Sequence, residues 1–127
     1  QSVDSVALFQ KINQVSLELE KVMPVYLQVN IAKDTQKHGF SVKDFHKALP
    51  DMFLLSNVEI QGIMIIVPYS ENIDELRGYF NCAYQLFSQV KNVYPSIQVL
   101  SMGMSQDYEL AIKCGSNLVR IGRSIFK

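Results

Sequence analysis

Two short segments near the end of the chain contain residues that could hold an anion. Residues 100–105 read LSMGMS, and residues 118–124 read LVRIGRS. Each begins as an apolar run and changes to glycine, serine or arginine where a strand would leave a sheet. In α/β proteins such strand ends gather backbone N–H groups that bind anions. Because one predicted helix separates the two segments, we expect them to form a phosphate cradle together.

Ser105 in the first segment has two interpretations. It could be the N-cap of the helix that follows, with Asp107 and Glu109 in the first turn complementing the helix dipole. Alternatively, its hydroxyl and the exposed N–H groups could hold a phosphate, provided that the two acids point to solvent. Gly103 would let the chain bend closely around such a ligand. Local sequence leaves both interpretations open.

The second segment also has alternatives. Arg120 lies between Val119 and Ile121 in an apolar strand, so its charge needs a partner. That partner is either a carboxylate on another strand, the commoner case, or a ligand acceptor. Gly122 at a strand end is by default a turn residue, and Arg123 faces either the phosphate or water.

Other residues point away from metal and redox chemistry. His38 and His46 have no second histidine or cysteine at ligand spacing, so we expect no metal site. Cys82 and Cys114 form no paired motif and have no cation beside them in the sequence, so they are expected to be buried thiols. The sequence contains no recognisable Ser-His-Asp set or pair of acids, and no catalytic residue is assigned.

Two further groups of residues are expected to serve the interior. The methionines Met64, Met102 and Met104 are most simply explained as core filling. Gln28 and Asn30 share one face of a strand, so they either line the mouth of a pocket or form bonds inside a barrel.

Composition limits the classes of protein that fit. The chain has 127 residues, of which 48% are hydrophobic, enough for one globular core. Twelve basic residues balance 12 acidic ones, so no charge excess favours nucleic acid or an anionic membrane. No apolar run approaches the roughly 18 residues of a membrane span. We find no signal segment and expect a cytoplasmic protein.

Strand and helix patterns alternate along the chain. The predicted strands are residues 2–4, 25–31, 58–67, 97–101 and 117–121. The predicted helices are residues 6–22, a helix that opens at Ser41 and stops at Pro50, residues 73–93, and residues 106–114 closed by Gly115. Without a hairpin signal between strands, this order predicts a parallel sheet with right-handed crossovers.

Two α/β folds are compatible with this order, an open doubly wound sheet and part of a (β/α)8 barrel. No Gly-x-Gly-x-x-Gly follows the first strand, which weakens the dinucleotide-binding version. Phosphate-type loops on the last two strands favour the barrel, where such sites often follow strands seven and eight. A full barrel takes about 250 residues, so this chain is expected to be about half of one.

Five runs of residues carry a resemblance to a known family. They are Gln28-Val29-Asn30, Lys37-His38-Gly39-Phe40, Gln61-Gly62-Ile63-Met64, the LSMGMS segment and Val119-Arg120-Ile121-Gly122. In this order they resemble the pyridoxal phosphate homeostasis proteins of the YggS/PROSC type. That family is similar in fold to the barrel domain of alanine racemase. The resemblance implies a protein that binds pyridoxal 5′-phosphate and acts in vitamin B6 and amino-acid homeostasis, as a carrier or regulator rather than an established enzyme.

The resemblance also implies roles for individual residues. Ser105 would bond the cofactor phosphate, and Gly122 and Arg123 would meet it with backbone N–H groups. Arg120 would face the pyridine nitrogen and disfavour its protonation, because two positive groups repel. Arg123 stands where the family often has a small hydroxyl residue, so no side-chain contact is inferred for it.

The family's Schiff-base lysine lies on the first strand of the barrel, in a motif that is absent here. Residues 1–127 are therefore interpreted as a single fragment from about strand 4 to strand 8, the C-terminal half, whose partner is the missing N-terminal half. Two enzyme alternatives remain, a pyridoxal-phosphate-dependent amino-acid racemase of related fold and a phosphate-binding barrel aldolase or isomerase. An upstream lysine would separate the first from the second.

Overall fold

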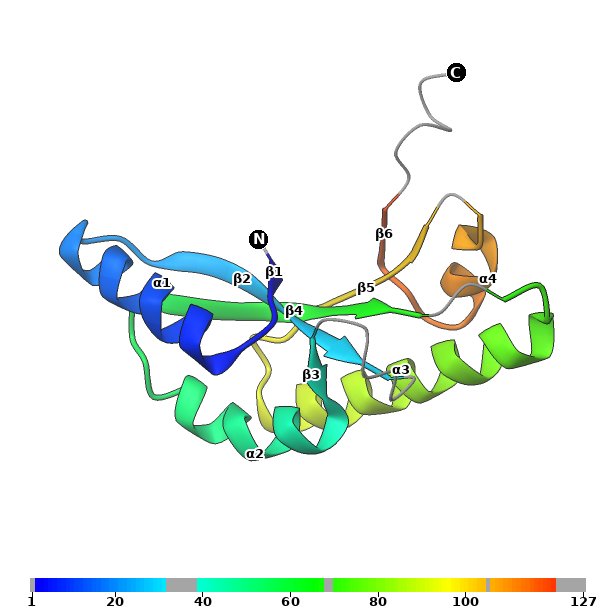
Figure 1. Ribbon diagram of the computed structural model, residues 1–127, viewed down its shortest axis with the longest axis horizontal. Helices are drawn as coiled ribbons and strands as arrows, with labels where there is room; N and C mark the ends of the chain where they lie inside the picture. The colour runs from blue at the N-terminus through cyan, green and yellow to red at the C-terminus, as the bar shows by residue number, and fades with distance from the viewer. Residues whose placement is uncertain (1, 32–38, 68–69, 105, 121–127) are drawn as a thin grey trace, which may run out of the picture.

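Strands and helices alternate along the chain in the computed structural model, which describes residues 2–31, 39–67, 70–104 and 106–120 (Figure 1). In order, the elements are β1 (Ser2–Val3), α1 (Val6–Glu18), β2 (Met23–Asn30), β3 (Phe40–Ser41), α2 (Val42–Met52), β4 (Val58–Ile66), α3 (Ile73–Val93), β5 (Val99–Met104), α4 (Tyr108–Lys113) and β6 (Leu118–Arg120). The predicted alternation is confirmed, and the short β3 is an addition to it.

The described strands form one parallel sheet. Its order is β1, β2, β4, β5, β6, with β3 paired to β2 off this path. Each of these pairings is parallel, as the alternation predicts. The most extensive pairing joins β2 to β4, from Met23↔Val58 to Asn30↔Ile66. Apart from β3, strand order across the sheet follows chain order, so right-handed crossovers place the connecting helices on one face.

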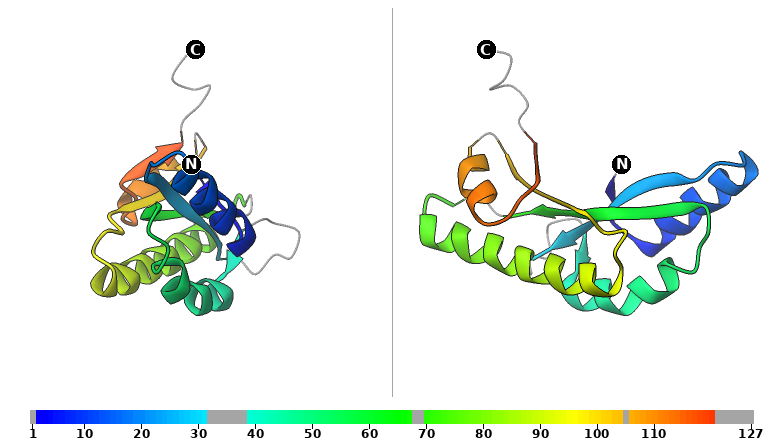
Figure 2. Two further views of the ribbon diagram at one scale, coloured as in Figure 1. Left: turned by 90° about the vertical axis from the view of Figure 1, so that its left-hand side faces the viewer. Right: turned by 180° about the vertical axis from the view of Figure 1, so that it is seen from behind.

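That helix-bearing face contains the core. Leu27 of β2, Ile63 of β4 and Leu100 of β5 are fully buried on it, beneath Phe45 of α2 and Phe80 of α3. Burying a side chain of this size contributes about 1.5–3 kcal/mol. Figure 2 shows α2 and α3 side by side along this face, seen end-on in its left view.

The opposite face, here called the far face, presents the alternate residues of the same strands. Register aligns Gln28, Met64, Ser101 and Leu118 across it. In Figure 1, β6 stands up from the sheet on the side away from α2 and α3, so the sheet curls toward its far face. This curvature is that of a barrel wall rather than of a sheet covered on both sides.

Two helix starts follow from their capping residues. Ser41 is the N-cap of α2, where its hydroxyl accepts from the N–H of Asp44 at 3.1 Å. Asn72 caps α3 and accepts from the N–H groups of Asp74 and Glu75. The predictions that α2 opens at Ser41 and that α3 spans residues 73–93 are confirmed.

Pro50 does not stop α2, and the prediction that it does is wrong. The helix contains Pro50 and ends at Met52. Proline removes only the N–H that would bond the carbonyl of His46, and Phe53 donates to Leu49 one residue beyond the helix end. In the last turn this single loss is tolerated.

The predicted end of the first helix at residue 22 is also wrong. α1 ends at Glu18, and Glu20 adopts a left-handed φ of 56°. Lys21 donates to the carbonyl of Ser16 at 2.9 Å and Glu20 to that of Leu17 at 3.1 Å. These two bonds form a Schellman motif, which terminates a helix whatever the apolar spacing beyond it.

Near the chain end, the boundaries of two predicted elements shift. β5 spans Val99–Met104 rather than 97–101, and α4 spans Tyr108–Lys113 rather than 106–114. β6 falls inside the predicted strand 117–121. Within the described residues, none of the helices combines the length and apolar character of a bilayer span.

Candidate functional site

The carboxyl ends of β5 and β6 lie next to each other. Ser101 pairs with Leu118, and Met104 pairs with Arg120. The two segments that contain the predicted anion-binding residues therefore leave the sheet side by side. This is the geometric condition that a shared phosphate cradle requires.

A β-bulge at Gly103 makes these two ends coincide. Between the paired positions, β5 advances three residues and β6 advances two, so one residue of β5 is extra. Gly103 has a φ of 101°, a conformation that suits glycine and that a bulge often needs. A β-carbon there would lie 2.6 Å from the β-carbon of Ala111 in α4. Contacts within the chain itself therefore explain why residue 103 is a glycine, in addition to the suggested bending around a ligand.

The N-cap position of α4 belongs to Asp107. The helix begins at Tyr108, so the interpretation of Ser105 as its N-cap is wrong, as is the placement of Asp107 in the first turn. Asp107 makes no side-chain cap bond to the helix and instead accepts from the backbone N–H of Met104 at 2.7 Å. Its carboxylate is therefore held back against the end of β5.

Ser116 and Asn117 fasten the start of β6 to β5, and sequence reasoning missed both. The Ser116 hydroxyl lies 2.7 Å from the carbonyl oxygen of Met102 and 3.0 Å from that of Leu118. Asn117 accepts from the N–H of Leu100 and donates its amide to the carbonyl of Gln98, both at 2.8 Å. The Asn117 side chain thus imitates a strand backbone. The sequence pattern predicted Asn117 only as the first residue of the strand 117–121 and assigned no role to Ser116.

Polar side chains continue along the far face toward its carboxyl edge. Gln28 and Asn30 are buried, and so is Ser101 on β5. Each of the three has a bonding partner, so none is free. At the amino-terminal edge strand, the Ser2 hydroxyl lies 2.8 Å from the sulfur of Met64. The polar lining of this face favours the interior role for Gln28 and Asn30.

The four residues assigned to the cofactor fall mostly beyond the described residues. Ser105, Gly122 and Arg123 lie outside them, and of Arg120 only the backbone, at the end of β6, is described. The structure therefore brings together the strands that lead to these residues. The contacts of the four side chains and N–H groups stay predictions.

Two expectations about burial are wrong. Met102 is fully buried as core filling and Met64 is half-buried, but Met104 is 52% exposed, because the bulge turns it away from the helices. Cys82 is exposed rather than buried, because the buried face of α3 runs through Phe80 and Ala83 on either side of it. Cys114 is half-buried.

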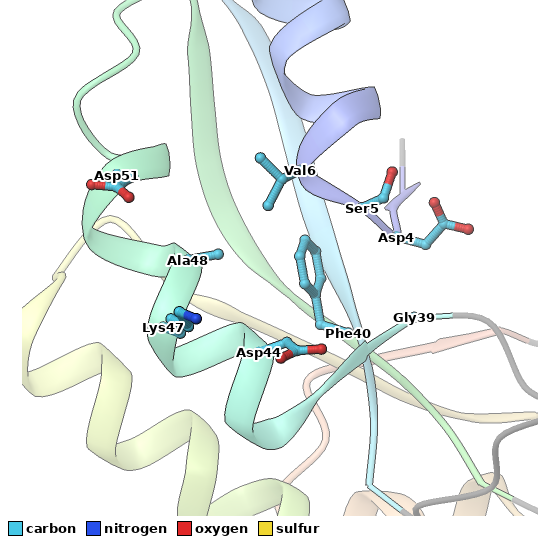
Figure 3. Close-up of a pocket in the computed structure, with 9 residues that line it drawn as sticks. All are labelled: Asp4, Ser5, Val6, Gly39, Phe40, Asp44, Lys47, Ala48 and Asp51. Atoms are coloured by element: carbon cyan, nitrogen blue, oxygen red, sulfur yellow. The ribbon is translucent and has the colours of Figure 1, made fainter.

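A separate groove of about 450 Å³ opens between the start of α1, β3 and α2 (Figure 3). Asp4, Asp44 and Asp51 line it together with Lys47. Within the described ranges, no group of three or more His, Cys, Asp or Glu could hold a metal ion. The groove includes no residue of β5 or β6, so it is distinct from the strand ends described above.

Comparison with known proteins agrees with this architecture. The family model described as "Alanine racemase, N-terminal domain" matches residues 1–127. A pyridoxal phosphate homeostasis protein of Haemophilus influenzae is 33% identical over 128 residues, which cover 99% of this chain and 54% of that protein.

Solved structures show the same fold. PipY of Synechococcus elongatus PCC7942 without PLP has a TM-score of 0.90 at 31% identity, over 98% of this chain and 59% of PipY. The structure of PipY with PLP bound has a TM-score of 0.86 at 30% identity, over 98% and 58%. An alanine racemase of Clostridium difficile 630, at 18% identity and a TM-score of 0.74, shares the fold over 95% of this chain and 32% of its own length.

The chain spans about half the length of the curated relatives it matches. Its parallel, one-sided and curled sheet is accordingly about half of a (β/α)8 barrel. On the match of its entire length, the chain belongs to the alanine racemase N-terminal domain family.

Proposed function

We propose that this chain is the C-terminal half of a pyridoxal 5′-phosphate-binding protein that serves vitamin B6 and amino-acid homeostasis without catalysing a reaction. The observation that carries the proposal is the pairing of Met104 with Arg120, which aligns the two strand ends beside a polar far face. It is supported by the likeness to PipY, whose structure with PLP bound matches 98% of this chain. The name of the Haemophilus influenzae relative supports the homeostatic role.

The donor set proposed at this edge suits a phosphate group. Ser105 would donate its hydroxyl to the phosphate, and Gly122 and Arg123 would donate backbone N–H groups. The Asp107 carboxylate repels a bound phosphate less than an unpaired carboxylate would, because it accepts a hydrogen bond from the N–H of Met104. Hydrogen bonds to a charged phosphate are among the stronger ones in proteins.

Arg120 would act on the ring rather than on the phosphate. When bound, the cofactor supplies an electron sink whose strength depends on protonation of the ring nitrogen. A guanidinium beside that nitrogen disfavours its protonation, because the two positive charges repel. A weaker electron sink is compatible with binding and storage of the cofactor.

The covalent anchor would come from a lysine outside residues 1–127. Lysines of the described residues lie on helices or on the turn after α1, and none lies in a strand; they are Lys11, Lys21, Lys43, Lys47, Lys91 and Lys113. We assign the Schiff-base lysine to the N-terminal half of the barrel, which would complete the sheet beside β1. The residues present here, which would correspond to about strand 4 to strand 8, would then bind the phosphate.

The function is tested on the full-length protein. Borohydride reduction in the presence of PLP, followed by peptide mass analysis, is expected to place a pyridoxyl group on a lysine upstream of these residues. Racemisation of L-alanine by the unreduced, PLP-loaded full-length protein would contradict the non-catalytic role. An aldolase or isomerase that binds only sugar phosphates would give no pyridoxyl peptide.

We place the protein in the cytoplasm, where the free thiols of Cys82 and Cys114 remain reduced.

A further inference from the structure

Met104 is an apolar side chain in an unexpected position. It ends β5 and is 52% exposed, whereas Met102, two residues earlier in the same strand, is fully buried under the helices. On a regular strand, residues that lie two positions apart share a face, so Met102 and Met104 would be expected on the same side. The difference therefore comes from the bulge between them.

The register shows which way Met104 points. Paired residues of neighbouring strands lie on the same side of a sheet. Leu118 pairs with Ser101 on the far face, and Arg120, two residues later in β6, pairs with Met104. Met104 thus belongs to the far face with Ser101, at the edge where β5 and β6 end.

The position of Met104 is held by its backbone. Its N–H is bonded to the Asp107 carboxylate at 2.7 Å, so the main chain offers no free donor at this point. What Met104 presents to the far face is its thioether side chain. A thioether is polarisable and packs favourably against an aromatic ring, a contact that a plain hydrocarbon makes less well.

We propose that Met104 packs against one face of the pyridine ring of bound PLP and thereby favours aromatic phosphates over non-aromatic phosphate esters. The proposal rests on the proposed function, because it takes the phosphate to lie at Ser105, the next residue. In PLP a single methylene group separates the phosphate ester from the ring. A phosphate gripped just beyond Met104 therefore brings the ring within reach of its side chain.

Oxidation footprinting of the full-length protein tests the contact without any activity assay. Dilute hydrogen peroxide converts exposed methionines to sulfoxides at rates that follow their exposure. We expect PLP to slow the oxidation of Met104 several-fold. The oxidation rate of Met23, which begins β2 at the edge of the sheet away from the proposed site, should not change. Equal Met104 oxidation with and without PLP, while the PLP absorbance shift shows binding, overturns the proposal. Absence of any PLP binding would instead remove the proposed function together with it.

Substitution tests the selectivity. Met104→Ala is expected to weaken PLP binding roughly threefold to tenfold, with Met104→Leu in between. Binding of inorganic phosphate alone is expected to be unchanged in both variants. Ile112→Ala is the matched control, because Ile112 on α4 is also 52% exposed and lies outside the site. An equal loss of PLP and phosphate binding in Met104→Ala, or no loss of PLP binding, overturns the proposal.

Discussion

Gly103 and Ala111 approach so closely that a β-carbon on the glycine would lie 2.6 Å from the β-carbon of the alanine. Gly103 also has a φ of 101°, which side chains rarely adopt. We expect Gly103→Ala to lower the free energy of unfolding by about 2–5 kcal/mol, the sum of backbone strain and overpacking. Urea denaturation measures the loss.

The double variant Gly103→Ala/Ala111→Gly separates the two causes. It removes the contact with the β-carbon of Ala111 but keeps the unfavourable φ, and it adds the cost of about 1 kcal/mol for a glycine inside α4. The reference is therefore Ala111→Gly alone, and Gly103→Ala is expected to lower stability less in that background than in the parent protein. A single Gly103→Ala variant as stable as the parent would show that β5 carries no bulge at this residue.

Gly78, in the second turn of α3, is a glycine whose replacement should stabilise the protein instead. It is exposed, and a β-carbon there would meet nothing within 4 Å. We expect Gly78→Ala to stabilise the protein by about 0.5–1 kcal/mol, because alanine loses less backbone entropy in a helix. Thermal unfolding would show a raised midpoint. Gly62→Ala is the contrasting variant, since its β-carbon would lie 2.3 Å from the carbonyl oxygen of Val99 and should destabilise.

Glu20 occupies the left-handed position of the Schellman motif that ends α1. Glycine is the usual residue there, because a side chain in this conformation costs about 1–2 kcal/mol. We therefore expect Glu20→Gly to raise the free energy of unfolding by about 0.5–1 kcal/mol after the entropy cost of glycine. Glu20→Ala keeps a β-carbon and should show no such gain in the same denaturation series.

Asn117 is predicted to control how firmly β6 is attached. Asn117→Ala removes both 2.8 Å bonds, to Leu100 of β5 and to Gln98 just before it, and should cost about 1–2 kcal/mol. Hydrogen exchange of the Leu100 N–H should then accelerate, because its acceptor is gone. Asn117→Asp retains that acceptor and should preserve protection at Leu100 while losing the bond to Gln98. Unchanged exchange in Asn117→Ala would show that the side chain does not fasten the strands.

Ser105→Ala tests the phosphate grip directly. Loss of a hydroxyl bonded to a charged phosphate is expected to weaken PLP retention by about 1–3 kcal/mol. Equilibrium dialysis of the full-length protein measures it. Ser56→Ala, on the turn between α2 and β4, should retain PLP like the parent protein. Retention unaffected by Ser105→Ala would remove Ser105 from the site.

The sequence predicted α3 to the residue because both of its ends carry local signals. Asn72 is a strong cap at the start, and Tyr94-Pro95 follows the last turn. The parallel sheet was also predictable, since it follows from strand and helix order alone.

The end of β5 could not be predicted in the same way. Gly103 indicated a strand end, but in a bulge glycine lets the strand continue to Met104. The attachment of β6 was hidden for a different reason. The bonds of Ser116 and Asn117 join side chains to the backbone of another strand, and such pairings depend on register rather than on local pattern.

The consequence of an all-parallel sheet is kinetic. A parallel pair cannot form from a hairpin, so β2 and β4 meet only after the chain has closed a long loop that contains α2. Slow refolding from denaturant is therefore expected, with a yield that falls as protein concentration rises, because unpaired strands persist long enough to find one another in solution.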